Sequence, residues 1–82
     1  MTDSENFYVS LLDLLEDPAE KQDVHSLLQW WNRCDSQLQR CDYLLTISRR
    51  IFPHADPGTR RPIEGSALAS IKRRRQLLQR EA

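Results

Sequence analysis

Residues 17–33 read DPAEKQDVHSLLQWWNR, and this stretch decides how the chain folds. Asp17 is suited to cap a helix, because its carboxylate can accept hydrogen bonds from the free backbone N–H groups of the first turn. Pro18 then takes the first helical position, where a missing N–H costs nothing. Glu20 completes an Asp-x-x-Glu variant of the capping box. Together these residues predict a helix that begins at Pro18.

Beyond the cap, apolar residues recur every seven positions, and a second series follows three positions later. The first series is Val24, Trp31, Leu38 and Leu45, and the second is Leu27, Cys34, Cys41 and Ser48. This spacing is typical of a helix face that is buried against other helices. Cys, Trp and Ser are poor core residues for a coiled coil, so the pattern favours an irregular helical hairpin or bundle.

The second helix is expected to extend from Pro18 to about Ser48. The run from Tyr43 to Ile47 could also form a short strand. No other segment nearby offers this run a partner strand, and an isolated strand is unstable in water. We therefore expect the helix to continue through it.

A first helix is expected from Glu5 to Glu16, capped by Asp3 or Ser4. One side of it carries Tyr8, Leu11, Leu12 and Leu15. Asp17 should end this helix, because the residue before a proline is disfavoured in the α conformation. Since the connection is so short, the first helix should fold back on the second and form a hairpin over residues 4–33.

The segment 53–65, PHADPGTRRPIEG, contains three prolines and both glycines of the chain. This composition predicts a loop, with a turn at residues 56–58. Ser66 is then expected to cap a loosely packed basic helix over residues 66–82. The sequence thus predicts an all-α chain with a hairpin unit at 1–52, a loop at 53–65 and a basic C-terminal helix, forming one small domain or a fragment.

Charge is distributed unevenly along the chain. Residues 1–42 hold nine acidic and three basic residues, a net charge of −6, whereas residues 43–82 hold nine basic and three acidic residues, a net charge of +6. Such asymmetry indicates either a basic tail for an acidic partner or two halves that attract one another.

The acidic N-terminus lacks the apolar run of a signal peptide, and no run approaches the roughly 18 apolar residues of a membrane span. We therefore expect an intracellular protein, cytoplasmic or nuclear, with reduced thiols and no membrane association. A chain of 82 residues with 39% hydrophobic residues can bury only a modest core. A protein partner or self-association would relieve that shortage.

No residue pattern predicts catalysis, a metal site or a cofactor. Cys34 and Cys41 lie about 10 Å apart if they share one helix, which is too far for a disulfide. Zinc sites need more closely spaced ligand pairs than His25, Cys34, Cys41 and His54 provide. The phosphate loops, nucleophile elbows and metalloprotease motifs of common enzymes are absent from the sequence. We therefore expect a non-catalytic protein.

Two groups of residues are candidates for binding. The first is an apolar cluster that could anchor a protein partner, formed by Leu27, Leu28, Trp30 and Trp31. Trp30 lies off the heptad stripe, so it either packs at the flank of the core or is exposed as an anchor, a role in which tryptophan is enriched.

The second group is the basic run Lys72, Arg73, Arg74 and Arg75. It could attract nucleic-acid phosphates or act as a nuclear localisation patch. However, four consecutive residues surround a helix instead of forming one stripe, and no aromatic residue lies among them for base stacking. The run could therefore simply be a solvated, charge-balancing helix end.

Three stretches of the chain read FYVSLLDLLEDPAEKQDVHSLLQWWNR, then IFP, then GSALASIKRRR. Together they resemble the C-terminal segment of proteins of unknown function from mushroom-forming fungi. The resemblance implies a helical segment and no known activity, cofactor or site. It omits residues 34–49, where the fungal pattern is nearly continuous. One hypothesis is that residues 34–49 are an intron translated in error, although the heptads continue through Leu38 and Leu45; sequencing the transcript decides this.

Overall fold

Across residues 3–81, which the computed structural model describes, the chain forms four α-helices, two short 3-10 helices and no strand. The α-helices are α1 (Asp3–Leu11), α2 (Pro18–Arg33), α3 (Gln37–Ile51) and α4 (Pro57–Glu81). The 3-10 helices η1 (Leu12–Leu14) and η2 (Phe52–His54) extend α1 and α3. The predicted all-α fold is confirmed.

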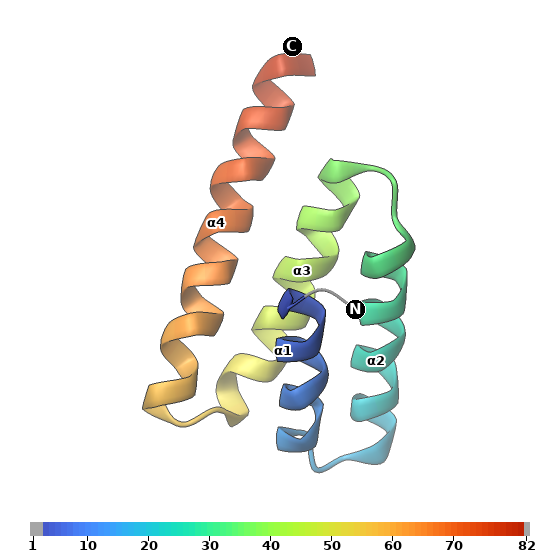
Figure 1. The fold of residues 1–82 in the computed structure, drawn as a ribbon, viewed down its shortest axis with the longest axis vertical. Helices are drawn as coiled ribbons and strands as arrows, with labels where there is room; N and C mark the ends of the chain where they lie inside the picture. The colour runs from blue at the N-terminus through green and yellow to red at the C-terminus, as the bar shows by residue number, and fades with distance from the viewer. Residues whose placement is uncertain (1–2, 82) are drawn as a thin grey trace.

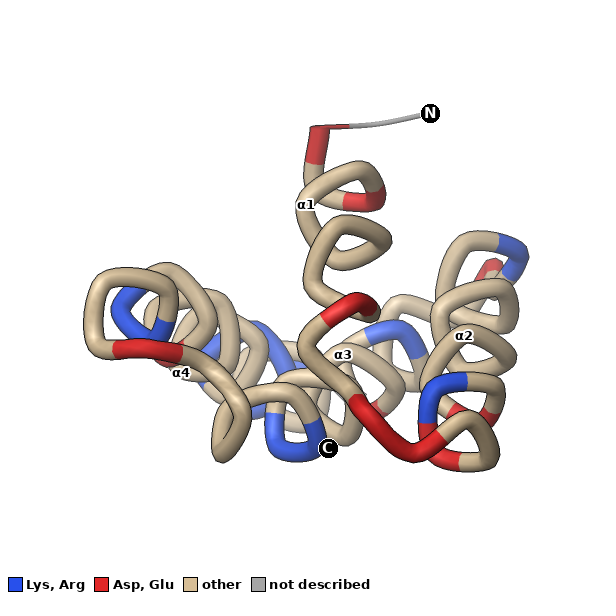
Figure 2. Tube along the Cα trace, turned by 90° about the horizontal axis from the view of Figure 1, so that it is seen from below, with Lys and Arg blue, Asp and Glu red and all other residues tan. Residues whose placement is uncertain are grey.

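The helices run alternately down and up, each antiparallel to its neighbour in sequence (Figure 1). Viewed along the bundle, α4, α3 and α2 lie side by side in one layer, and α1 lies on one face of that layer (Figure 2). The central helix α3 therefore contacts both α2 and α4.

The start of α2 at Asp17 and Pro18 is as the sequence predicts, although Glu20 does not form the predicted capping-box hydrogen bond within residues 3–81. The carboxylate of Asp17 accepts a hydrogen bond from the backbone N–H of Ala19 at 3.0 Å, and Pro18 is the first helical residue. α1 and η1 precede this cap and fold back against α2, which confirms the predicted hairpin. Lys21 in α2 also forms an ion pair with Asp13 in η1, with 3.1 Å between the charged atoms.

The core lies where α1 covers α2 and α3. Its buried side chains come from every α-helix, and they include all four residues predicted along one side of the first helix. The core consists of Tyr8, Leu11, Leu12, Leu15, Val24, Leu28, Trp31, Ile47, Ile51, Ala55 and Ile63. The hydroxyl groups of Tyr8 and Ser48, both buried, form a hydrogen bond of 3.2 Å, so the polar tip of Tyr8 is satisfied inside the core.

The predicted extension of the second helix to Ser48 is wrong, because residues 34–36 are not helical. Cys34 and Ser36 adopt extended backbone angles, and the hydroxyl of Ser36 accepts a hydrogen bond from the backbone N–H of Gln39 at 3.3 Å. Ser36 therefore caps a new helix. The heptad pattern continues because α2 and α3 each turn an apolar face toward the same core.

The predicted loop over residues 53–65 is also shorter in the structure, since α4 begins at Pro57 and not at Ser66. The carboxylate of Asp56 accepts a 2.7 Å hydrogen bond from the backbone N–H of Thr59. Asp56 and Pro57 thus repeat the cap and first-position proline of Asp17 and Pro18. Hydrogen bonding by the side chain of Thr59, and then by its backbone N–H, lowers the pKa of the Asp56 carboxyl.

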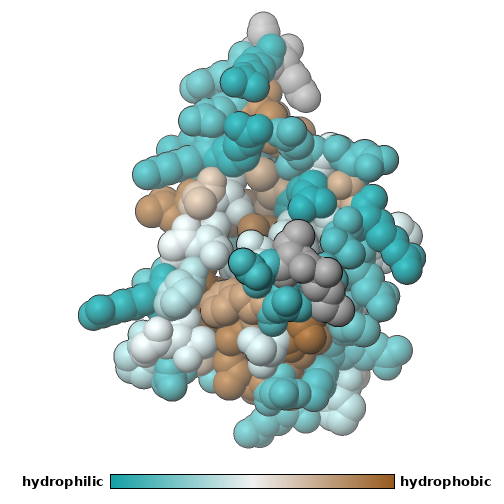
Figure 3. Space-filling model, in the orientation of Figure 1, coloured by the Kyte–Doolittle hydropathy of each residue, from teal (hydrophilic) through white to brown (hydrophobic). Residues whose placement is uncertain are grey.

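The first half of α4 is anchored to the bundle, and its last turns project beyond it. Ile63 and Ser70 are buried. At about 1.5 Å per residue, the 25 residues of α4 span roughly 37 Å and the 15 residues of α3 only about 22 Å. The C-terminal end of α4 therefore extends past α3 (Figure 1), where hydrophilic side chains dominate the surface (Figure 3).

The two oppositely charged halves of the chain attract one another within the fold. Acidic residues concentrate in α1 and the turn into α2 (Figure 2). Of the three ion pairs among the described residues, two join the acidic half to the basic half: Arg50 with Asp23 at 3.8 Å and Arg74 with Asp42 at 2.6 Å. The charge asymmetry thus contributes to internal packing.

Replacing Ser36 with alanine should lower the free energy of unfolding by about 1 kcal/mol, because α3 loses its cap. For a chain of this size the melting temperature should fall by roughly 4–8 °C. The control is Asp35→Ala in the same turn, an exposed position that should change stability by less than about 0.5 kcal/mol. Thermal unfolding followed by circular dichroism measures the stability of both variants. An equal loss of stability in Ser36→Ala and Asp35→Ala would contradict the assigned cap.

Candidate functional site

The four residues of the predicted apolar cluster do not form one surface. Leu28 and Trp31 are buried in the core, and Leu27 is half-buried against it. Trp30 alone is largely exposed, with 60% of its surface accessible. A partner could therefore contact Trp30 and the edge of Leu27, whereas Leu28 and Trp31 stabilise the fold.

Trp30 lies on the side of α2 that faces away from the core. It follows Asp23 by two helical turns, so the two side chains project from the same side of the helix. Asp23 pairs there with Arg50 of α3. Trp30 thus adds an exposed indole to the side of α2 that carries the Asp23–Arg50 pair.

The predicted basic run is divided between the α3 contact and the solvent. The Nη2 group of Arg73 donates a 2.6 Å hydrogen bond to the side-chain carbonyl of Gln37, and Arg74 pairs with Asp42. Lys72 and Arg75 are exposed and form no ion pair with any residue between 3 and 81. Half of the run therefore holds α4 against α3.

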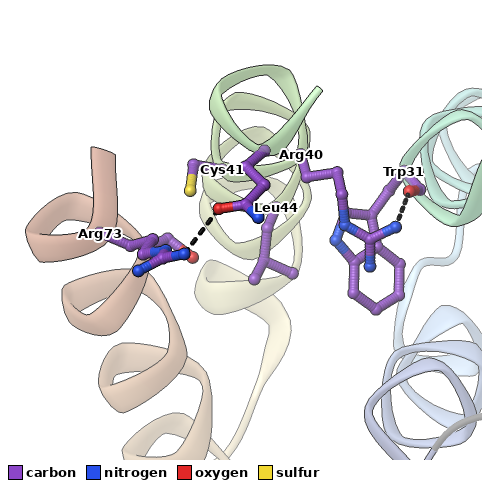
Figure 4. Close-up of a pocket in the computed structure, with 7 residues that line it drawn as sticks. Trp31, Arg40, Cys41, Leu44 and Arg73 are labelled. Atoms are coloured by element: carbon purple, nitrogen blue, oxygen red, sulfur yellow. Dashed lines mark hydrogen bonds between the residues drawn. The ribbon is translucent and has the colours of Figure 1, made fainter. Parts of the chain in front are cut away.

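One pocket brings together residues from both predicted groups (Figure 4). It has a volume of about 310 Å³ and lies where α2, α3 and α4 meet. Its lining consists of Trp31, Gln37, Arg40, Cys41, Leu44, Ser70 and Arg73. Sequence reasoning selected Trp31 and Arg73 separately, but it did not place them together.

Arg40 shapes one wall of this pocket. Its guanidinium carbon lies 5.1 Å from the centre of the Trp31 ring, in the geometry of a cation–π contact. Its Nη1 group donates hydrogen bonds to the backbone carbonyls of Trp31 at 3.0 Å and Cys34 at 3.4 Å. Arg40 thus satisfies carbonyl groups at the C-terminal end of α2, which have no partner inside the helix.

Cys41 lies in the pocket wall with a buried side chain. Burial raises the pKa of its thiol, and the neighbouring Asp42 carboxylate raises it further. Arg73, Arg74 and Arg40 act in the opposite direction but are weaker than burial. The thiol is therefore less easily ionised than an exposed cysteine, which favours a structural role over a nucleophilic one.

Sequence reasoning missed Gln37, Arg40 and Ser70 as pocket residues. Gln37 and Arg40 lie on the solvent-facing side of a continuous helix if residues 18–48 are helical throughout, and Ser70 belongs to the separate basic helix. The signal that could have located them is the Asp35-Ser36 pair, which is a helix-start sequence within the heptads. Recognising that break would have placed Gln37 and Arg40 in the first turn of a returning helix.

Other titratable residues do not converge on this pocket. His25 and His54 are exposed, at separate places on α2 and η2. Within residues 3–81 no three His, Cys, Asp or Glu side chains are grouped so that they could hold a metal ion. No helix in the same range combines the length and apolar character needed to cross a membrane.

Comparison with protein families finds a match for the N-terminal part of the chain. Residues 1–34 match a family of unknown function (DUF6698). The match covers α1, η1 and α2 and ends at Cys34, where α2 gives way to the turn. No curated protein and no solved structure matches the chain. The matched segment is thus the helical hairpin, and the pocket residues of α3 and α4 lie outside it.

Alkylation should be slower at Cys41 than at Cys34, because Cys41 is buried and its raised pKa leaves less thiolate at any given pH. As the pH is increased, the alkylation rate at Cys41 should also rise only at a higher pH than is usual for a thiol, because the pKa of Cys41 is raised. Mass spectrometry of iodoacetamide-treated Cys34→Ser and Cys41→Ser chains measures each site alone. Faster reaction at Cys41 in the folded chain would contradict its burial.

Proposed function

We propose that this chain is a non-catalytic helical module that binds a protein partner, or a second copy of itself, through Trp30. The observation that carries the proposal is the 60% exposure of Trp30 on a helix whose other large apolar residues are buried or half-buried. Exposing an indole to water is unfavourable, and tryptophan is enriched among the residues that dominate binding energy. A partner that covers Trp30 would remove that apolar surface from water.

The proposed module fits the size of the molecule and the character of its pocket. The pocket described above has no convergent acid, base and nucleophile, which catalysis would require. Its residues are instead engaged in helix contacts, as Arg40 and Arg73 show. From the sequence features and the fungal resemblance we also propose that the chain works inside the cell, in the cytoplasm or nucleus, as the helical C-terminal segment of a larger fungal protein.

Trp30→Ala should weaken partner binding by about 2 kcal/mol or more, roughly thirtyfold in affinity, if Trp30 is the anchor. The matched control is Leu68→Ala, which removes another exposed apolar side chain, 54% accessible, from α4. Sedimentation velocity of the purified variants measures self-association. Quantitative crosslinking in host extract compares capture of other proteins.

The proposal requires that Trp30→Ala reduces association or capture while Leu68→Ala leaves it unchanged. Both variants should keep the helicity and unfolding temperature of the parent chain, since both side chains are largely exposed. Association that is the same in all three proteins would remove Trp30 as the anchor.

The alternative is binding to nucleic acid through the basic helix. It is favoured by Lys72 and Arg75, which are exposed and form no ion pair among residues 3–81. These two cations on the exposed side of α4 could contact phosphates without breaking the bonds that Arg73 and Arg74 make to α3. This function would use a different surface from Trp30.

DNA binding that uses this helix should weaken linearly on a logarithmic scale as salt increases, because phosphate contacts release counterions. Replacing Lys72 and Arg75 with glutamine should reduce the salt slope by roughly 1 for each of the two side chains that binds a phosphate. Fluorescence anisotropy with labelled duplex DNA measures the slope. Absence of binding at low salt, or affinity that is independent of salt, excludes this class of function.

A further inference from the structure

The pocket between α2, α3 and α4 is lined by side chains of one charge sign. Two of its seven lining residues are arginines, Arg40 and Arg73, and none is acidic. The acid next to Cys41 in the sequence, Asp42, lines a separate pocket and pairs with Arg74. The positive charge of the two guanidinium groups is therefore not cancelled by any carboxylate in the pocket lining.

Both guanidinium groups keep N–H donors for a ligand. Each arginine side chain has five N–H donors. Arg73 uses Nη2 to reach Gln37, and Arg40 uses Nη1 to reach two backbone carbonyls. The Nε group and the other terminal nitrogen of each form no hydrogen bond with residues 3–81. In Figure 4 the two side chains lie on opposite sides of Leu44, with Arg73 reaching in from α4 and Arg40 lying against Trp31.

The helix ends at this pocket add to its attraction for anions. Gln37 is the first residue of α3, a helix of 15 residues, so the positive end of the α3 dipole is at the pocket. The C-terminal end of α2, which is the negative end of that helix dipole, also lies near the pocket. The hydrogen bonds of Arg40 to the carbonyls of Trp31 and Cys34 offset this negative charge. Ser70 adds a hydroxyl to the wall on α4.

We propose that this pocket binds a small soluble molecule that carries a phosphate group. Arginine forks match the geometry of phosphate oxygens and bind them with charge-assisted hydrogen bonds. A volume of about 310 Å³ is at the lower end of the range for small-molecule sites, which limits the ligand to a small one. The site is separate from Trp30 and does not depend on the function proposed above.

The test uses the Trp30→Phe chain, in which Trp31 is the single remaining tryptophan. Because Arg40 lies over the Trp31 ring, a ligand that contacts Arg40 should change the fluorescence of Trp31. Inorganic phosphate and pyrophosphate are titrated separately at constant ionic strength. We expect saturable binding of both, tighter for pyrophosphate, together with slower alkylation of Cys41 when the pocket is occupied.

Arg73→Gln and Arg75→Gln form a matched pair on this background. Both remove one positive charge from α4, but only Arg73 lines the pocket. Arg73→Gln should weaken pyrophosphate binding by about tenfold or more, the factor that corresponds to 1.4 kcal/mol. Arg75→Gln should change it less than twofold. Equal weakening by the two substitutions, or no saturable binding in the parent chain, overturns the proposal.

A further variant separates ligand binding from the attachment of α4 to α3. Asp42→Asn removes the ion pair that joins the neighbouring Arg74 to α3 and leaves the pocket lining intact. Binding that persists in Asp42→Asn and is abolished in Arg73→Gln supports direct contact with the anion. Binding that is abolished equally in both variants, with unchanged helicity, overturns it. Binding of duplex DNA alone, with no response to pyrophosphate, also overturns it and favours the nucleic-acid surface.

Discussion

Burial of one face of α2 is the constraint on which the rest of the structure depends. Val24, Leu28 and Trp31 cover two turns of that face and are almost inaccessible to solvent. Both α1 and α3 pack against α2, and Tyr8 of α1 lies edge-on to the Trp31 ring at 6.2 Å. The N-terminal segment therefore folds back from one end of α2, and α3 returns from the other. The turns at the two ends of α2 thus allow α1 and α3 to bury its apolar face.

The break between α2 and α3 follows from that requirement. A single helix over residues 18–51 would be about 50 Å long at 1.5 Å per residue, and its apolar stripe would lie largely in water. Folding back instead lets Ile47 and Ile51 pack in the same core as Val24. Ser36 caps the returning helix, and Arg40 satisfies carbonyls at the end of the outgoing one. The pocket beside Arg40 is a consequence of this arrangement.

Charge has a double role in the molecule. The ion pairs between Arg50 and Asp23 and between Arg74 and Asp42 fasten the basic half of the chain to the acidic half. Such partly exposed pairs contribute little stability individually, so the attachment of α4 depends mainly on packing, to which the buried Ile63 and Ser70 belong. Arg73 and Arg40, which are not paired with acids within residues 3–81, leave a positive pocket beside the start of α3.

The sequence by itself determined the all-α class, the start of α2 at Asp17 and Pro18, and the buried side of the first helix. These features depend on local capping and on periodicity, which can be recognised without knowing what packs where. Periodicity does not reveal that a helix stops and reverses, because the faces of α2 and α3 continue one heptad pattern. The start of α4 was also missed, because the Asp56-Pro57 cap lies among other prolines and glycines and resembles a turn. Only the tertiary structure decided that Trp30 is exposed while Trp31 is buried, and that Arg40 and Arg73 share a pocket, since both depend on where a distant helix lies.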